Sequence, residues 1–127
     1  MALNVFGQPL AHCCLDPVTG FFRDGFCKTG AQDAGSHVIC ACITPEFLEF
    51  TLGMGNDLIT PKPAADFPGL KPGDKWCICA IRWKEAYEAG VAPPVFLAST
   101  HYKALNFVDF GVLAAYAIDK EIYLSAS

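Results

Sequence analysis

Two short stretches, Ser36 to Ile43 and Lys75 to Ile81, constrain the fold of this chain more than any other feature. Both are rich in apolar residues, and these residues occupy both of the alternating positions along each stretch. Successive side chains of a strand point to opposite faces, so a strand of this kind has to be covered on both sides. The sequence therefore predicts two central strands.

Helical signals follow each predicted strand. Thr44 and Pro45 are typical of an N-cap followed by proline in the first turn, and Gly53 to Gly55 is expected to end that helix. A second helix is expected from Arg82 to Ala89, with Gly90 as its stop signal.

The remaining elements are expected to be short. We predict an extended piece at 21–23, a third strand at 95–98, a helical turn capped by Thr100 and a last helix capped by Asp109. The order of strand, helix and strand over 75–98 predicts a right-handed crossover.

These elements predict one α+β domain over residues 1–127, with a small mixed β-sheet and helices packed mainly on one face. Long loops rich in proline and glycine are expected at 7–36 and 56–74. A loop as long as 56–74 is uncommon inside a compact domain and is often functional.

Composition limits the partners. Apolar residues make up 53% of the chain and charged residues 17%. The apolar share exceeds that of most soluble domains, which predicts a homo-oligomer, most plausibly a dimer. The formal charge is −4 and the basic residues are scattered, which argues against nucleic acid and anionic membranes as partners. The sequence shows no signal peptide and no membrane-length apolar stretch, which predicts a cytoplasmic location.

Seven cysteines in a cytoplasmic protein are expected to be reduced. Cys40 and Cys42, like Cys77 and Cys79, place two thiols on one face of a strand, about 6–7 Å apart. A zinc site needs sulfurs about 4 Å from one another. We therefore expect these cysteines to be buried, reduced and not bound to a metal, and we expect no cofactor.

Cys27 has a different setting, because it lies in a turn-rich segment near Arg23, and a nearby cation favours a reactive thiolate. Cys13 and Cys14 follow His12, which could act as a base. The candidate catalytic residues are Cys27, His101 and Asp24.

Arg82 is the first charged residue after an apolar strand, and three interpretations of it remain open. It could pair with Glu85 at the surface, bind an anionic ligand at the end of the sheet, or bond an internal carboxylate. The candidate ligand-binding residues are Arg23, Arg82, Trp83, Asn56 and Asp57.

Several stretches together resemble one known family. They include 16–27, with the sequence DPVTGFFRDGFC, the run 67–79, FPGLKPGDKWCIC, and the segment 82–94, RWKEAYEAGVAPP. Over roughly residues 4–119 the chain resembles the largely bacterial domain-of-unknown-function family twenty-two thirty-seven (DUF2237). The resemblance implies a small α+β domain, and it brings no assigned activity and no established site residues.

Two function classes follow from the residues. The first is a small-molecule site, binding or catalytic, for an anionic ligand in a cleft under the 56–74 loop. The alternative is a non-enzymatic interaction or oligomerisation module, in which the apolar surplus forms an interface; a structural metal-binding domain ranks third. The sequence leaves open whether the protein is an enzyme.

Overall fold

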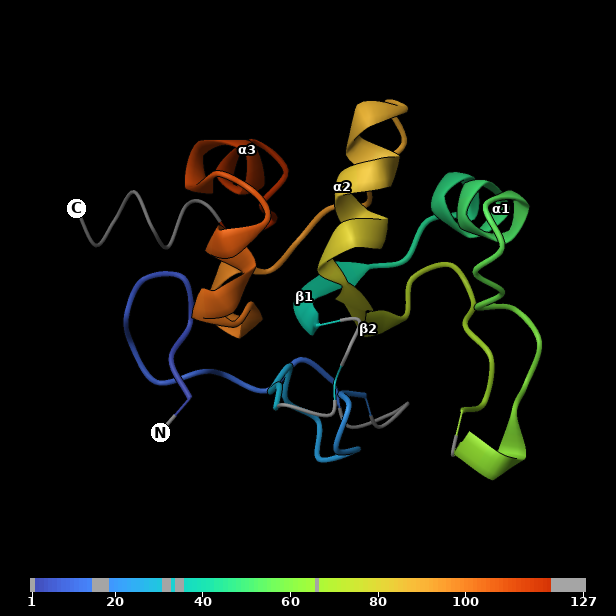
Figure 1. Ribbon diagram of the computed structural model, residues 1–127, viewed down its shortest axis with the longest axis horizontal. Helices are drawn as coiled ribbons and strands as arrows, with labels where there is room; N and C mark the ends of the chain where they lie inside the picture. Colours follow the sequence, from blue (N-terminus) through green and yellow to red (C-terminus); the bar gives the residue numbers. More distant parts are fainter. Residues whose placement is uncertain (1, 15–18, 31–32, 34–35, 66, 120–127) are drawn as a thin grey trace.

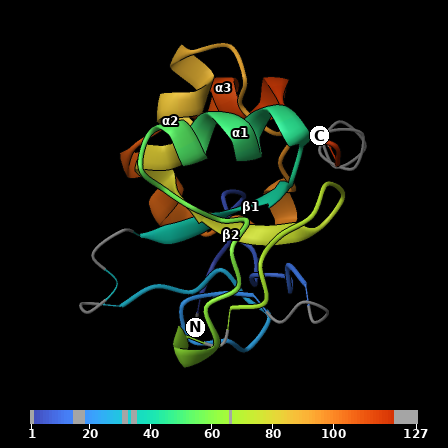
Figure 2. The same cartoon turned by 90° about the vertical axis from the view of Figure 1, so that its right-hand side faces the viewer.

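The structure is a computed structural model that describes residues 2–14, 19–30, 33, 36–65 and 67–119. Its centre is a two-stranded sheet of β1 (His37–Cys42) and β2 (Lys75–Cys79). Helices α1 (Pro45–Gly53), α2 (Ala80–Glu88) and α3 (Phe110–Ala115) lie on one side of this sheet. The N-terminal loops and part of the 56–74 loop lie on the other side (Figures 1 and 2). The α+β class and the placement of the helices are as predicted.

The two strands pair antiparallel, and one irregularity interrupts their register. Ile39 lies opposite Ile78, and Cys40 lies opposite Cys77. Continued regularly, this register would place Val38 opposite Cys79. The irregularity between His37 and Ile39 instead places His37 opposite Cys79.

The prediction of a third strand at 95–98 is wrong, and so is the prediction of a crossover that depended on it. Val95 forms only isolated bridges, antiparallel with Ala41 and parallel with Ala117, and a 3-10 turn follows at Leu97–Ser99. The cause is Asp119, whose carboxylate accepts the N–H groups of Leu97 and Ala98 at 2.8 and 3.0 Å. These donors are therefore not available to a neighbouring strand.

The helices follow their sequence signals closely. The Thr44 hydroxyl accepts the N–H of Phe47 at 3.1 Å, so α1 begins at the predicted cap, and it ends at Gly53. Helix α2 begins at Ala80, two residues earlier than predicted, and buries Trp83. No helix among the described residues is long and apolar enough to cross a membrane.

The short elements differ more from the predictions. Residues 21–23 form a turn rather than an extended piece, and Arg23 has a positive φ of 54°. His101, rather than Thr100, caps the 3-10 helix Tyr102–Asn106, because its Nδ1 atom accepts the N–H of Lys103 at 3.0 Å. Asp109 occupies the N-cap position of α3 without a side-chain capping bond.

Two disulfides cross-link the face of the sheet opposite the helices. Cys13 is bonded to Cys40, and Cys27 is bonded to Cys77. All four are buried, and together they form a core cluster separate from the main apolar core. Cys40 and Cys77 are register partners on the two neighbouring strands, so the two disulfides lie side by side.

The prediction that the cysteines are reduced is therefore wrong for these four. Cys40 and Cys77 are buried, as expected, but their partners lie 27 and 50 residues away along the chain. The spacing of cysteines two residues apart along a strand cannot reveal such distant partners. Cys14, Cys42 and Cys79 are half-buried and outside disulfides.

Loss of either disulfide is expected to destabilise the fold strongly. In the chain-entropy account, bonds that close segments of 27 and 50 residues contribute about 3–4 kcal/mol each. Urea unfolding of the double variant Cys27→Ser/Cys77→Ser should show a loss of this size. The control is Cys42→Ser, which removes a half-buried thiol outside any disulfide and should cost less than about 1 kcal/mol. Equal unfolding midpoints for the two variants would contradict this account.

Candidate functional site

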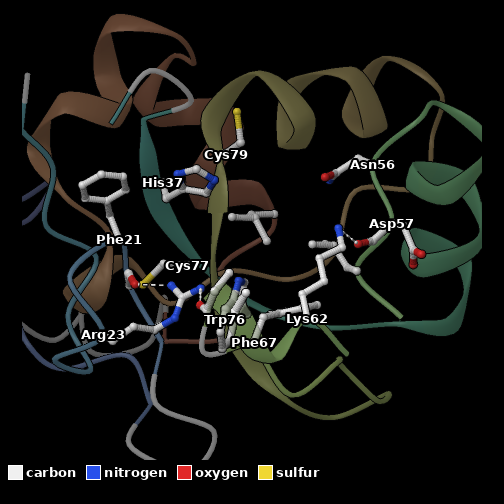
Figure 3. A pocket seen from close by; sticks show the side chains of 15 residues that line it. Phe21, Arg23, His37, Asn56, Asp57, Lys62, Phe67, Trp76, Cys77 and Cys79 are labelled. Atoms are coloured by element: carbon white, nitrogen blue, oxygen red, sulfur yellow. Dashed lines mark hydrogen bonds between the residues drawn. The ribbon is translucent and has the colours of Figure 1, made fainter. Parts of the chain in front are cut away.

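A pocket of about 500 Å³ opens between the N-terminal loop, the 56–67 segment and the end of the sheet (Figure 3). Its walls combine aromatic rings with polar and charged side chains. The described lining residues include Phe21, Arg23, His37, Asn56, Asp57, Lys62, Phe67, Trp76 and Cys79. The pocket is of a size that holds small organic ligands.

Arg23 connects two loops across one end of the pocket. Its guanidinium donates to the carbonyl of Gly20 and, at 3.0 Å, to that of Ala65. Its Cζ atom lies 5.1 Å from the centre of the Trp76 ring, within the range of a cation–π contact (Figure 3). The Trp76 ring also packs edge-on against Phe67. These contacts hold a cation beside an aromatic wall.

Lys62 and Asp57 face the pocket from the 56–67 segment. The Lys62 ammonium donates to the backbone carbonyl of Asp57 at 3.2 Å. The Asp57 carboxylate accepts the N–H groups of Ile59 and Thr60. Hydrogen bonds from the Thr60 side chain, then from these two backbone groups, lower the pKa of Asp57. Asp57 is thus ionised, and its carboxylate is engaged in shaping its own loop.

His37 is held by a buried carboxylate. Its Nδ1 atom lies 2.6 Å from Asp33 Oδ1, and its backbone N–H donates to Asp33 Oδ2 at 2.9 Å. The hydroxyl of Thr29 donates to the same Oδ2 atom at 3.1 Å. Asp33 is 3% exposed, whereas the His37 side chain is 41% exposed and lines the pocket.

Cys79 lines the same end of the pocket as His37. It is half-buried, lies outside the disulfides and is the register partner of His37 across the two strands. Cys79 is also the N-cap residue of α2, so β2 passes directly into the helix at this thiol. Figure 3 shows the Cys79 sulfur and the His37 ring at this end of the pocket.

Three of the five predicted ligand-binding residues line the pocket, and two lie elsewhere. Arg23, Asn56 and Asp57 line the pocket. Trp83 is fully buried in the main core, where its indole N–H donates to the Pro93 carbonyl at 3.0 Å. Arg82 donates to the Met54 carbonyl at 3.1 Å and to Glu85 at 3.3 Å, which is the surface pairing among the three interpretations.

The three predicted catalytic residues are not brought together at the pocket. Cys27 is fully buried in its disulfide with Cys77. Asp24 accepts the N–H of Phe26 and pairs with Lys28 at 3.2 Å. His101 caps a 3-10 helix, and burial, followed by the charge of Lys103, lowers the pKa of its imidazole.

Sulfur atoms gather in a way that resembles a metal site. The Sγ atoms of Cys13, Cys27 and Cys77 lie within 4.8 Å of one another. Cysteine binds a metal ion as the thiolate, and a sulfur in a disulfide carries no such charge. In the disulfide-bonded state, this cluster is therefore a structural core rather than a ligand set.

Four polar residues that shape the pocket were not among the candidates from the sequence: His37, Asp33, Lys62 and Cys79. One signal was present, because Asp33 precedes His37 by four residues in a turn-rich segment, where a carboxylate often bonds nearby donors. Cys79 was assigned to the core together with its strand. The helix was expected to begin at Arg82, whereas it begins at Ala80 and so leaves Cys79 at the end of the strand.

Comparison with known proteins identifies a family whose description assigns no activity. The DUF2237 family model, described as an uncharacterized protein conserved in bacteria, matches residues 3–117. No curated protein matches the chain.

Substitution of Arg82 by alanine should have a modest effect. The side chain is part-exposed and bonds one carbonyl at the end of α1 and one carboxylate, so its loss should cost about 0.5–1.5 kcal/mol. Chemical unfolding of wild type and Arg82→Ala measures this difference. A loss above about 3 kcal/mol would instead indicate that a buried carboxylate had lost its partner.

Proposed function

The chain belongs to the DUF2237 family, and we propose that it binds a small anionic ligand with a planar apolar part. The ligand would occupy the pocket beside Arg23, Lys62 and Trp76. The observation that carries this proposal is the placement of two cationic side chains around one aromatic-walled pocket (Figure 3).

The charge in the pocket runs against the charge of the chain. The protein carries a formal charge of −4, whereas the described charged residues that line the pocket are Arg23, Lys62 and Asp57. Asp57 is engaged with the N–H groups of its own loop. Two positive groups therefore line the pocket, and the partial burial of Arg23 strengthens its attraction for an anion relative to open solvent.

Arg23 is a suitable anchor because its position is fixed. Its bonds to the carbonyls of Gly20 and Ala65 orient the guanidinium. A preorganised cation loses less entropy on binding than a free one. The Trp76 and Phe67 rings beside it are largely buried and give the pocket wall an apolar part for the rest of the ligand.

Benzoate and benzamide test the proposal directly, because they have nearly the same shape and differ in charge. We expect benzoate to bind at least about fivefold more tightly, since one charge-assisted contact contributes about 1 kcal/mol. The indole N–H signal of Trp76 in ¹H–¹⁵N NMR spectra reports the titration at the pocket. Trp83, buried in the core, provides an internal reference.

Two lysine variants complete this test. Lys62→Ala should remove most of the preference for benzoate, whereas Lys84→Ala, an exposed position on α2 away from the pocket lining, should leave it unchanged. Equal affinities of wild type for benzoate and benzamide, or no shift of the Trp76 signal with either, would overturn the proposal.

A further inference from the structure

The bond between His37 and Asp33 determines which nitrogen of the imidazole is free to react. Asp33 is a buried carboxylate that accepts bonds from His37 Nδ1, the His37 backbone and the Thr29 hydroxyl. A carboxylate can only accept, so the proton of the neutral ring resides on Nδ1. Nε2 then carries a lone pair and can take up a proton.

The irregular register of the sheet determines what this imidazole faces. A regular ladder would place Val38 opposite Cys79, and the irregularity places His37 there instead. Side chains of directly opposed residues lie on the same face, with Cβ atoms about 4.5–5.5 Å apart. Irregularities of this kind often re-aim a side chain next to an active site. His37 and Cys79 thus occupy facing positions at one edge of the pocket.

The start of α2 adds hydrogen-bond donors at the same place. Cys79 is the N-cap residue of this nine-residue helix, and its side chain makes no capping bond. The N–H of Ala80 donates to the Ser36 carbonyl, whereas those of Ile81 and Arg82 have no acceptor within the helix. Donors in a first helical turn stabilise negative charge that develops beside them.

From this geometry we propose that Cys79 is a nucleophile and His37 its general base, with Asp33 as the positioning residue, in hydrolysis of an ester or thioester. In the first half, Sγ–H gives its proton to His37 Nε2 and Sγ attacks the carbonyl carbon. The Sγ–C bond forms, the bond to the leaving oxygen or sulfur breaks, and His37 returns the proton to the leaving group.

Water completes the second half. His37 takes a proton from the water, whose oxygen attacks the thioester carbon. The Sγ–C bond then breaks, the acid product leaves, and His37 returns the proton to the Cys79 sulfur. The class of substrate rests on the proposed function, because the acyl group would occupy the same pocket: a small ester or thioester with an anionic group within reach of Lys62 and Arg23.

Alkylation tests the nucleophile without a substrate. Iodoacetamide is uncharged, so its reaction does not depend on the anion site. We expect Cys79 to react at least about tenfold faster than Cys14 and Cys42, the other two half-buried cysteines outside disulfides, as read by peptide mass spectrometry. Equal rates at the three thiols would overturn the proposal.

Ester hydrolysis tests the mechanism. We expect wild type to hydrolyse 4-nitrophenyl hydrogen glutarate faster than the neutral 4-nitrophenyl butyrate and to form an acyl adduct on Cys79. Cys79→Ser and His37→Gln should each lose roughly a thousandfold in kcat, whereas Cys42→Ser should not change it. Hydrolysis that survives in Cys79→Ser, or wild type without hydrolysis or adduct, would overturn the proposal.

Asp33→Asn tests the positioning role. This variant should lower kcat at least about a hundredfold while KM stays within about twofold. The reason is that the amide no longer holds the imidazole in the tautomer with its proton on Nδ1, whereas the pocket that binds the substrate is unchanged. If this variant does not fold, the rates at which iodoacetamide alkylates Cys79 in wild type and in His37→Gln test whether His37 activates the thiol: a slower rate in His37→Gln supports the proposal, and equal rates reject it. Benzoate binding separates the two proposals: binding without acylation rejects the catalytic inference alone, whereas absent binding rejects the anion site.

Discussion

The pair of disulfides beneath the sheet is the constraint on which the rest of the structure depends. A two-stranded sheet is only marginally stable in water unless it packs against other elements. Helices α1 and α2 cover one face, and Cys13–Cys40 and Cys27–Cys77 tie the loop-rich N-terminal segment to the other. The buried Thr19 hydroxyl adds a bond from the Cys77 N–H at 2.7 Å. Arg23 is thereby held against the 56–67 segment, which closes the pocket.

The chemistry of the pocket depends on a local departure from regular structure at each wall. The irregular register in β1 places His37 opposite Cys79, and the positive φ of Arg23 belongs to the turn from which its guanidinium reaches two carbonyls. Such departures cost conformational energy and persist only where surrounding contacts determine them. Here the contacts are the Asp33 carboxylate for His37 and the Trp76 ring for Arg23.

Local signals in the sequence were sufficient for the fold class, both strands, the Thr44 cap and three of the pocket residues. They were insufficient wherever a distant residue decides the structure. Asp119 takes the donors of the predicted third strand from 21 and 22 residues away, and both disulfides join cysteines that no spacing rule connects. Cys79 was assigned to a buried strand because nothing nearby in the chain reveals that His37 faces it. Self-association and the cytoplasmic location stay predictions.

The central claim is that four specific cysteines are paired and three are not. Peptide mapping by mass spectrometry without reduction, after alkylation of the unfolded protein, measures this directly. The account predicts two linked peptide pairs, Cys13 with Cys40 and Cys27 with Cys77, and alkyl groups on Cys14, Cys42 and Cys79 only. Alkylation of all seven cysteines, or a linkage that includes Cys79, would contradict it.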